Sequence, residues 1–190
     1  MDDEIDGVQL MKPMPSLDEL LIRAKSMGIY GTKMRSVIKM ANPKGIRAIV
    51  KQQFEIGKQI LGHGLVPIIE PEVDIHSPEK EACEELLKAE IMAQLNALDE
   101  HQNIILKLTL PSKVNFYREY VDHPNCIRVL ALSGGYSREK ANAILSKQTG
   151  MIGSFSRALS EDLNHNQTNE TFNNVLEESI SSIFFASNGG

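Results

Sequence analysis

The chain has 190 residues, of which 42% are hydrophobic and 24% are charged, and its net charge is -5. This composition predicts one soluble globular unit and excludes a collagen-like or disordered chain. The acidic charge, and the lack of a basic stripe with interleaved aromatic residues, argue against a nucleic-acid partner. No run of eighteen apolar residues is present, so we expect no membrane span.

Cysteine and histidine usage predicts a cytoplasmic protein without a metal cofactor. The chain has only two cysteines, Cys83 and Cys126, which are too few for a disulfide framework and fit a reducing compartment. The acidic start at residues 1–4 is not followed by an apolar segment, so we expect no signal peptide. The five histidines show neither an i, i+4 pair nor a spacing with cysteine that would hold zinc.

The elements predicted in chain order alternate between helix and strand. A capping-box pattern at residues 16–19 starts a helix that ends near Gly28. The serines of residues 179–182 and the tail 187–190 are expected to face solvent. From residue 29 onward, the chain predicts strands at 29–36, 65–70, 104–110, 126–132 and 151–156, and helices at 42–62, 77–98, 115–121, 137–147 and about 172–184.

This alternation favours an α/β fold with a parallel sheet. Five polar side chains fall near the strand ends at intervals of 37, 37, 26 and 24 residues, about one βα unit each: Lys33, Glu70, Lys107, Ser133 and Arg157. All five are therefore expected on one rim, as in a TIM (β/α)8 barrel. Only about five units are present, so we expect a partial TIM barrel with strands 4 to 8 in a single domain over residues 1–190.

Lys107 lies in the middle of an apolar strand, where an ammonium group is costly to bury. Desolvation favours the neutral amine, which can attack a ketone and form a Schiff base. A lysine that extends from an edge strand into water explains the same pattern equally well. The strand by itself leaves both interpretations open.

Four other charged residues are expected near Lys107. Glu70 and Glu72 are two residues apart on one face, as are Lys33 and Arg35. The carboxylates can divide acid and base work, or they can simply pair with the cations. A second lysine nearby would favour the neutral form of the less hydrated amine.

A glycine pair after the fourth strand predicts a phosphate site. Ser133, Gly134 and Gly135 precede a helix, so backbone N–H groups and the helix N-terminus can approach an anion. An ordinary strand-to-helix turn explains the glycine pair better when it is taken alone. Arg157 on the neighbouring strand changes this balance, because a guanidinium beside a backbone nest suits a sugar phosphate.

Four motifs resemble class I fructose-bisphosphate aldolase in its short bacterial form. They are GLVPIIEPE at 64–72, LKLTLP at 106–111, LSGGYS at 132–137 and SFSRAL at 154–159. The resemblance runs from about residue 7 to about residue 186, with the motifs in the family's order and spacing. It implies a cytoplasmic glycolytic lyase that acts on sugar phosphates through a lysine Schiff base, without a metal or another cofactor.

The resemblance also implies residue roles. Lys107 matches the Schiff-base lysine and Glu70 the proton-transferring glutamate, while Glu72, Lys33 and Arg35 match the charged groups around them. Ser133, Gly134 and Arg157 match positions that hold phosphate. The implied reaction cleaves fructose 1,6-bisphosphate into glyceraldehyde 3-phosphate and dihydroxyacetone phosphate.

The chain departs from the family pattern by starting just after the third strand. An aspartate, a Ser/Gly-rich loop and a further lysine on the earlier strands are not in it. We therefore expect a truncated aldolase that is impaired alone, with open sheet edges that favour a homo-oligomer or association with another chain. The alternatives are a Schiff-base aldolase for another sugar phosphate and a non-catalytic remnant that binds a sugar phosphate or a partner chain.

Overall fold

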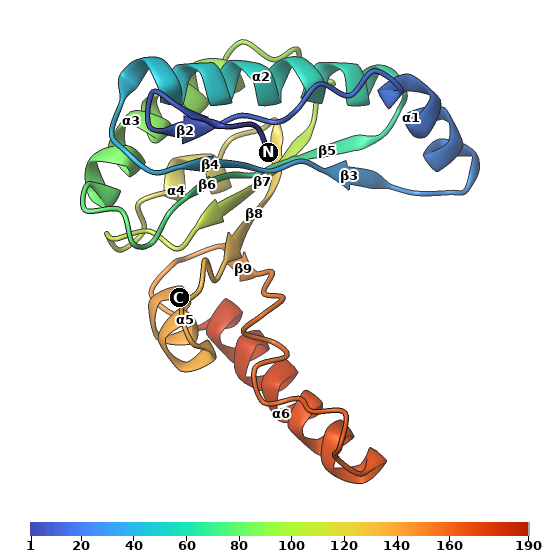
Figure 1. Ribbon diagram of the computed structural model, residues 1–190, viewed down its shortest axis with the longest axis vertical. Coiled ribbons are helices and arrows are strands. Elements are labelled where there is room, and N and C mark those ends of the chain that lie inside the picture. Colours follow the sequence, from blue (N-terminus) through green and yellow to red (C-terminus); the bar gives the residue numbers. More distant parts are fainter. Residues whose placement is uncertain (190) are drawn as a thin grey trace.

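Five βα units follow one another in the computed structural model, which describes residues 1–189. Each unit passes from a strand of one parallel sheet to a helix, and the fold is α/β as expected (Figure 1). A first helix, α1 (Leu17–Ser26), precedes them. The units are β3 (Gly31–Lys33) with α2 (Pro43–Gly62), β5 (Val66–Ile69) with α3 (Lys80–Leu95), β7 (Ile104–Thr109) with α4 (Arg118–Val121), β8 (Cys126–Leu132) with α5 (Arg138–Leu145), and β9 (Met151–Gly153) with α6 (Asn169–Asn188).

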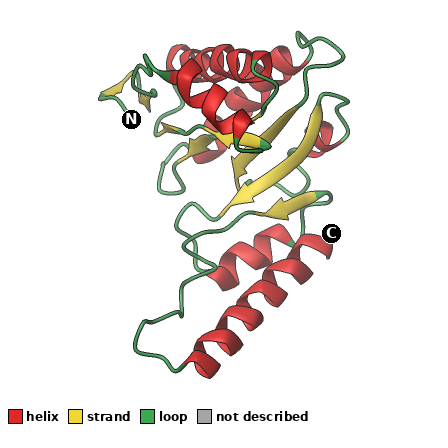
Figure 2. Ribbon diagram, turned by 90° about the vertical axis from the view of Figure 1, so that its right-hand side faces the viewer, coloured by secondary structure: helices red, strands yellow, loops and turns green. Residues whose placement is uncertain are grey.

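The five strands form one parallel sheet in the order β3-β5-β7-β8-β9. Within residues 1–189, β3 and β9 are its two edges, so the sheet is open, as a partial barrel requires. Helix α2 runs along one side of the sheet, whereas α5 and α6 lie together beyond β9 (Figures 1 and 2). No helix in this part of the chain has the length and apolar composition needed to cross a bilayer.

The core lies between the central strands and the helices that cover them. It is built from the apolar faces of α2 and α3 and from alternate residues of β7, because successive strand residues point to opposite faces. Leu106 and Leu108 flank Lys107 and are completely buried. They pack in one cluster with Ile49, Phe54 and Leu87.

A second, smaller sheet extends two of the expected strands. The strand expected at 29–36 is broken, because Met34 and Arg35 separate β3 from β4 (Ser36–Ile38). The strand expected at 65–70 ends before Glu70, and this residue separates it from β6 (Pro71–Val73). The elements β4 and β6 pair in parallel, and an N-terminal hairpin that the sequence did not predict, β1 (Glu4–Ile5) with β2 (Val8–Gln9), pairs antiparallel with β4.

Two helix starts show where local sequence rules held and where they failed. Asn42 caps α2 by accepting hydrogen bonds from the backbone N–H groups of Lys44 and Gly45, with Pro43 at the first helical position. Ser16 precedes α1, but its side chain makes no capping hydrogen bond, so the expected capping box does not form. The helix is instead anchored by the buried side chains of Leu17 and Leu21.

The sequence predicted that the serines near the C-terminus face solvent, and this prediction was wrong for Ser179. Ser179 is 1% exposed and accepts a hydrogen bond from the Arg138 guanidinium. Ser187 accepts a hydrogen bond from the backbone N–H of Gly153 and so ties α6 to β9. Residue 190, the last of the expected frayed tail, lies outside the described residues.

Candidate active site

The residues predicted for the site lie around one cavity at the carboxyl ends of the parallel strands. The cavity has a volume of about 470 Å³ and is lined by Lys33, Arg35, Glu70, Glu72, Lys107, Leu132, Ser133, Gly134, Ser154, Ser156 and Arg157. Parallel strands end on one side of a sheet, so residues far apart in sequence converge there. The structure thus brings together eight of the nine predicted residues; Gly135 lines an adjoining hollow that Arg157 shares.

Lys107 sits on the central strand of the sheet with its side chain only 16% exposed. Its strand neighbour in β8 is Leu130, and β5 covers the other side of β7. The edge-strand explanation for this lysine is therefore wrong, because β7 has a partner strand on each side. The side chain of this central lysine has little contact with water and lines the cavity.

Glu70 is shared between two lysines. Its Oε2 atom lies 3.0 Å from Lys33 Nζ and 3.7 Å from Lys107 Nζ, and its side chain is 5% exposed. Within residues 1–189 this oxygen is buried and has no partner with hydrogen-bond geometry. Glu70 therefore balances the charge of both amines and still has an acceptor position free to receive a proton or a hydrogen bond.

The backbone of Glu70 is held where the chain passes from one sheet to the other. Its carbonyl oxygen accepts hydrogen bonds from the backbone N–H of Ser36 and from Nε2 of Gln53, a completely buried side chain on α2. The same amide group of Gln53 also donates to Ser36 Oγ. This buried network fixes the backbone from which the Glu70 side chain reaches Lys33 and Lys107.

Arg35 and Glu72 form a second ion pair beside the first. Arg35 Nε donates to Glu72 Oε2 across 2.6 Å, and this hydrogen bond raises the pKa of Arg35 above its usual value. Arg35 occupies the break between β3 and β4, and Glu72 lies on β6, whose partner strand is β4. The pair closes the cavity on the side of the smaller sheet.

The predicted phosphate cradle borders this cavity and the hollow next to it, and it consists of Ser133, Gly134, Gly135 and Arg157. Gly134 and Gly135 have φ values of +63° and +113°, which favour glycine, and a Cβ atom on Gly134 would lie 2.7 Å from the side chain of Ile75. Ser133 is buried beside them, whereas Arg157 is exposed. The backbone conformation and the close approach of Ile75 thus require the glycine pair.

The cavity carries an excess of positive charge in an acidic protein. Its lining holds four cations, Lys33, Arg35, Lys107 and Arg157, and only the two carboxylates Glu70 and Glu72. The whole chain has a net charge of -5. A local excess of cations in a concave site attracts anionic ligands, and a phosphate ester is one of these.

Ser154 and Ser156 are lining residues that sequence reasoning missed. Both follow β9, and the backbone N–H of Ser154 donates to the Ala131 carbonyl oxygen on β8. Their position in the sequence could have indicated this role, because the two serines lie two residues apart just before Arg157, a predicted site residue. Among residues 1–189, no group of three or more histidine, cysteine or acidic side chains is arranged to hold a metal ion.

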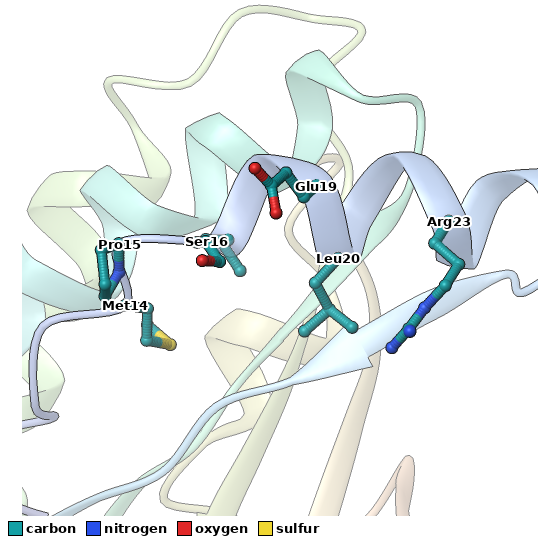
Figure 3. A pocket seen from close by; sticks show the side chains of 7 residues that line it. Met14, Pro15, Ser16, Glu19, Leu20 and Arg23 are labelled. Carbon is teal, nitrogen blue, oxygen red and sulfur yellow. The ribbon is translucent and has the colours of Figure 1, made fainter.

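A second hollow lies on the outer face of α1 and has a different character. It is lined by seven residues of one continuous segment, 14–17, 19, 20 and 23 (Figure 3). Leu20 is 49% exposed and Met14 is 40% exposed. Since no other element contributes a side chain, this hollow is an exposed apolar surface and does not gather chemical groups as the cavity at Lys107 does.

The sequence is closely similar to proteins of one kind. It is 57% identical over 187 residues to the class 1 fructose-bisphosphate aldolase of Porphyromonas gingivalis, covering 98% of this chain and 63% of that protein. It is 58% identical over 184 residues to the aldolase of the same name from Synechocystis sp., covering 97% of this chain and 61% of the relative. The chain is homologous to part of the class 1 fructose-bisphosphate aldolases.

The remaining comparisons agree with this relationship. The aldolase of the same name from Clostridium acetobutylicum is 56% identical over 182 residues, 96% of this chain and 62% of its own length. No family model matches the chain. It spans about three fifths of the length of the curated aldolases that it matches.

The fold agrees with that of a solved aldolase. A structure of fructose-bisphosphate aldolase from Plasmodium falciparum, in complex with TRAP and a small-molecule inhibitor, matches with a TM-score of 0.70. The match covers 96% of this chain and 67% of the solved chain at 18% identity, so it establishes the arrangement of the elements alone. The partial barrel predicted from the strand spacing is therefore an aldolase-like fold.

Proposed function

We propose that this chain carries the Schiff-base half of a metal-independent fructose-bisphosphate aldolase site. The observation that carries the proposal is the position of Lys107, a nearly buried amine 3.7 Å from the carboxylate of Glu70 in a cavity with excess positive charge. An amine nucleophile and a proton-transferring group within reach of one ligand atom are what imine formation requires. The ligand class is a ketose phosphate.

The proposed reaction begins at the ketone carbon of the substrate. Lys107 Nζ, as a neutral amine, attacks this carbon and loses one proton, which Glu70 passes to the carbonyl oxygen. A second proton, taken up from solvent through Glu70, lets that oxygen leave as water, and a protonated imine remains. The protonated imine then accepts the electron pair of the bond between the next two carbons as that bond breaks. The hydroxyl group on the outer carbon gives its proton to a carboxylate base, and the outer fragment leaves as the aldehyde product. Protonation of the resulting enamine and addition of water release the ketone product and restore the amine.

The phosphate of the ketone half would lie in the cradle formed by Ser133, Gly134 and Arg157. Hydroxyl groups, backbone N–H groups and one guanidinium suit a phosphate dianion, since each supplies a hydrogen-bond donor. Lys33 contacts Glu70, and Arg35 holds Glu72. Lys33 and Arg35 therefore keep the two carboxylates in place and contribute to the positive field.

Borohydride trapping tests the nucleophile without requiring carbon–carbon cleavage. The chain is treated with dihydroxyacetone phosphate and borohydride, and the adduct is located by intact mass and peptide mapping. We expect an adduct on Lys107 and none in a Lys107→Met variant. Lys33→Met is the matched control, because it removes the other amine beside Glu70. An adduct on Lys33, or none from a folded wild-type chain, contradicts the proposal.

We propose further that complete cleavage requires three more βα units docked on the open edges of the sheet. More than a third of the length of the aldolase relatives is unmatched by this chain, and three of eight units make a similar share of a barrel. Large apolar side chains are exposed near both edges. They are Met27, Ile29 and Tyr30 before β3, and Ile152, Ile180, Phe184 and Phe185 on β9 and α6.

Co-expression with the unmatched segment of the Porphyromonas gingivalis aldolase tests this second proposal. We expect a one-to-one complex on size exclusion and cleavage of fructose 1,6-bisphosphate by the complex alone. Ile152→Lys, at the β9 edge, should abolish the complex. Ile5→Lys, which alters an equally apolar exposed residue away from both edges, should not. Cleavage by the isolated chain, or a homo-oligomer that excludes the segment, would overturn it.

A further inference from the structure

Arg138 joins the two segments that form the phosphate cradle. It follows directly after Ser133–Ser137, the turn that carries the glycine pair, and is the first residue of α5. Its side chain crosses to the segment after β9, where Nη1 donates to the carbonyl oxygen of Ala158 across 3.4 Å and Nη2 pairs with Asp162. The backbone N–H of Arg138 also donates to Glu161 Oε2 across 2.7 Å.

The guanidinium has a third anchor inside the protein. Nη1 donates to Ser179 Oγ on α6 across 2.8 Å, and that hydroxyl donates in turn to the carbonyl oxygen of Val175. Ser179 is 1% exposed, and the Arg138 side chain is 21% exposed. Arg138 therefore connects α5, α6 and the segment after β9 through one planar group, whose fork geometry sets the distances between them.

This connection holds the backbone next to Arg157. Arg157 is exposed, and the next residue, Ala158, is 2% exposed with its carbonyl oxygen held by Arg138. Long exposed side chains keep much rotamer freedom, so a fixed backbone beside Arg157 lowers the cost of ordering it on a ligand. The Arg138 guanidinium is already paired with Asp162 and so adds little positive charge to the cradle.

We propose that Arg138 is a positioning residue, which fixes the glycine turn and Arg157 at the spacing that one phosphate group bridges. This inference rests on the proposed ketose-phosphate function and adds a determinant of its specificity. Arg138 acts through Arg157 and the backbone N–H groups of Gly134 and Gly135. Its effect is therefore confined to ligands that carry a phosphate, whereas a general structural role would affect every ligand equally.

The test compares a ketone with and without its phosphate. Imine trapping on the full chain is measured with dihydroxyacetone phosphate and with dihydroxyacetone, for the wild type, Arg138→Gln and Arg138→Lys. For Arg138→Gln we expect at least a tenfold higher half-saturating concentration of the phosphorylated ketone and no change for dihydroxyacetone. Arg138→Lys keeps the charge without the planar fork and should recover only part of the loss. Equal effects on both ketones, or none on either, overturn the inference.

Arg118→Gln is the matched control, because Arg118 makes two hydrogen bonds to Asp122 on an exposed face. This variant should behave as the wild type with both ketones, and circular dichroism confirms that each variant is folded. A second readout, titration of inorganic phosphate by isothermal calorimetry, separates the two proposals. If no ketone is trapped and phosphate still binds the wild type at least tenfold more tightly than Arg138→Gln, Arg138 positions an anion site and the aldolase proposal fails. If no ketone is trapped and the wild type binds no phosphate, the aldolase proposal and the inference about Arg138 both fail.

Discussion

Two buried lysine–glutamate clusters lie in this fold, and they are satisfied to different degrees. In the first, Lys80 donates to Glu84, to the Leu110 carbonyl oxygen and to Ser112 Oγ, while the backbone N–H of Ser112 donates to Glu84 Oε2. In the second, Glu70 Oε2 faces Lys33 and Lys107 without a hydrogen bond of good geometry. Lys80 and Lys107 are similarly buried, with side chains 12% and 16% exposed.

The difference separates a cluster that stabilises the fold from the cluster that we propose to perform chemistry. A buried charge is tolerated when its hydrogen bonds are complete, as they are at Lys80, where the cluster ties α3 to the loop after β7. An incompletely satisfied cluster persists where a ligand completes it, and the cluster at Lys107 borders the cavity of about 470 Å³. Hydrogen-bond satisfaction therefore separates the structural lysine from the proposed nucleophile better than burial does.

The largest expected effect on stability follows from breaking the satisfied cluster. Lys80→Met leaves the Glu84 carboxylate buried without its cation, which costs about 3 to 5 kcal/mol of unfolding free energy. Urea unfolding followed by circular dichroism measures the loss. The double variant Lys80→Met/Glu84→Leu removes both charges and should regain most of it. A single variant as stable as the wild type would contradict the structural role of this cluster.

Removing the charge of Glu70 should slow imine formation on Lys107. Glu70→Gln keeps the shape of the side chain but cannot transfer protons, so we expect imine formation on Lys107 about 100-fold slower. The rate is measured by quenching the borohydride reaction at timed intervals. Glu72→Gln is the control, because Glu72 is engaged by Arg35, and it should slow the reaction less than tenfold. Equal slowing in both variants would show that the two carboxylates act only through their charge.

Thr109 tests how firmly the strand of Lys107 is joined to the smaller sheet. Its Oγ1 accepts a hydrogen bond from the backbone N–H of Val73 across 2.9 Å and donates to the carbonyl oxygen of the same residue across 2.8 Å. Thr109→Val leaves both buried groups unpaired and should cost about 1 to 3 kcal/mol in thermal or urea unfolding. Thr109→Ser retains the hydroxyl and should lose much less, so equal losses would contradict this account.

The smallest expected effect on stability is at the proposed nucleophile itself. Lys107→Met should change the unfolding free energy by less than about 1 kcal/mol, because Glu70 keeps Lys33 as its counter-ion at 3.0 Å. The same urea experiment that measures Lys80→Met provides the comparison. A loss at Lys107 as large as at Lys80 would mean that both clusters are structural, and the contrast between them would disappear.

The sequence alone determined the order of the βα units and the identity of most site residues. Alternating strands and helices follow from local patterns of apolar residues, and caps such as Asn42 act within one turn. Residues at the ends of parallel strands must share a rim, so Lys33, Glu70, Lys107, Ser133 and Arg157 were predicted to converge. These inferences need only spacing along the chain.

Only the tertiary structure decided how those residues meet. The breaks at Arg35 and Glu70 depend on strand pairing between distant segments, as does the N-terminal hairpin. The same is true of the contact of Arg138 with Ser179, a serine that the sequence predicted at the surface. Local patterns contain no distances between segments, and hydrogen-bond satisfaction is a property of three-dimensional packing. For this reason the contrast between Lys80 and Lys107 appears only in the folded chain.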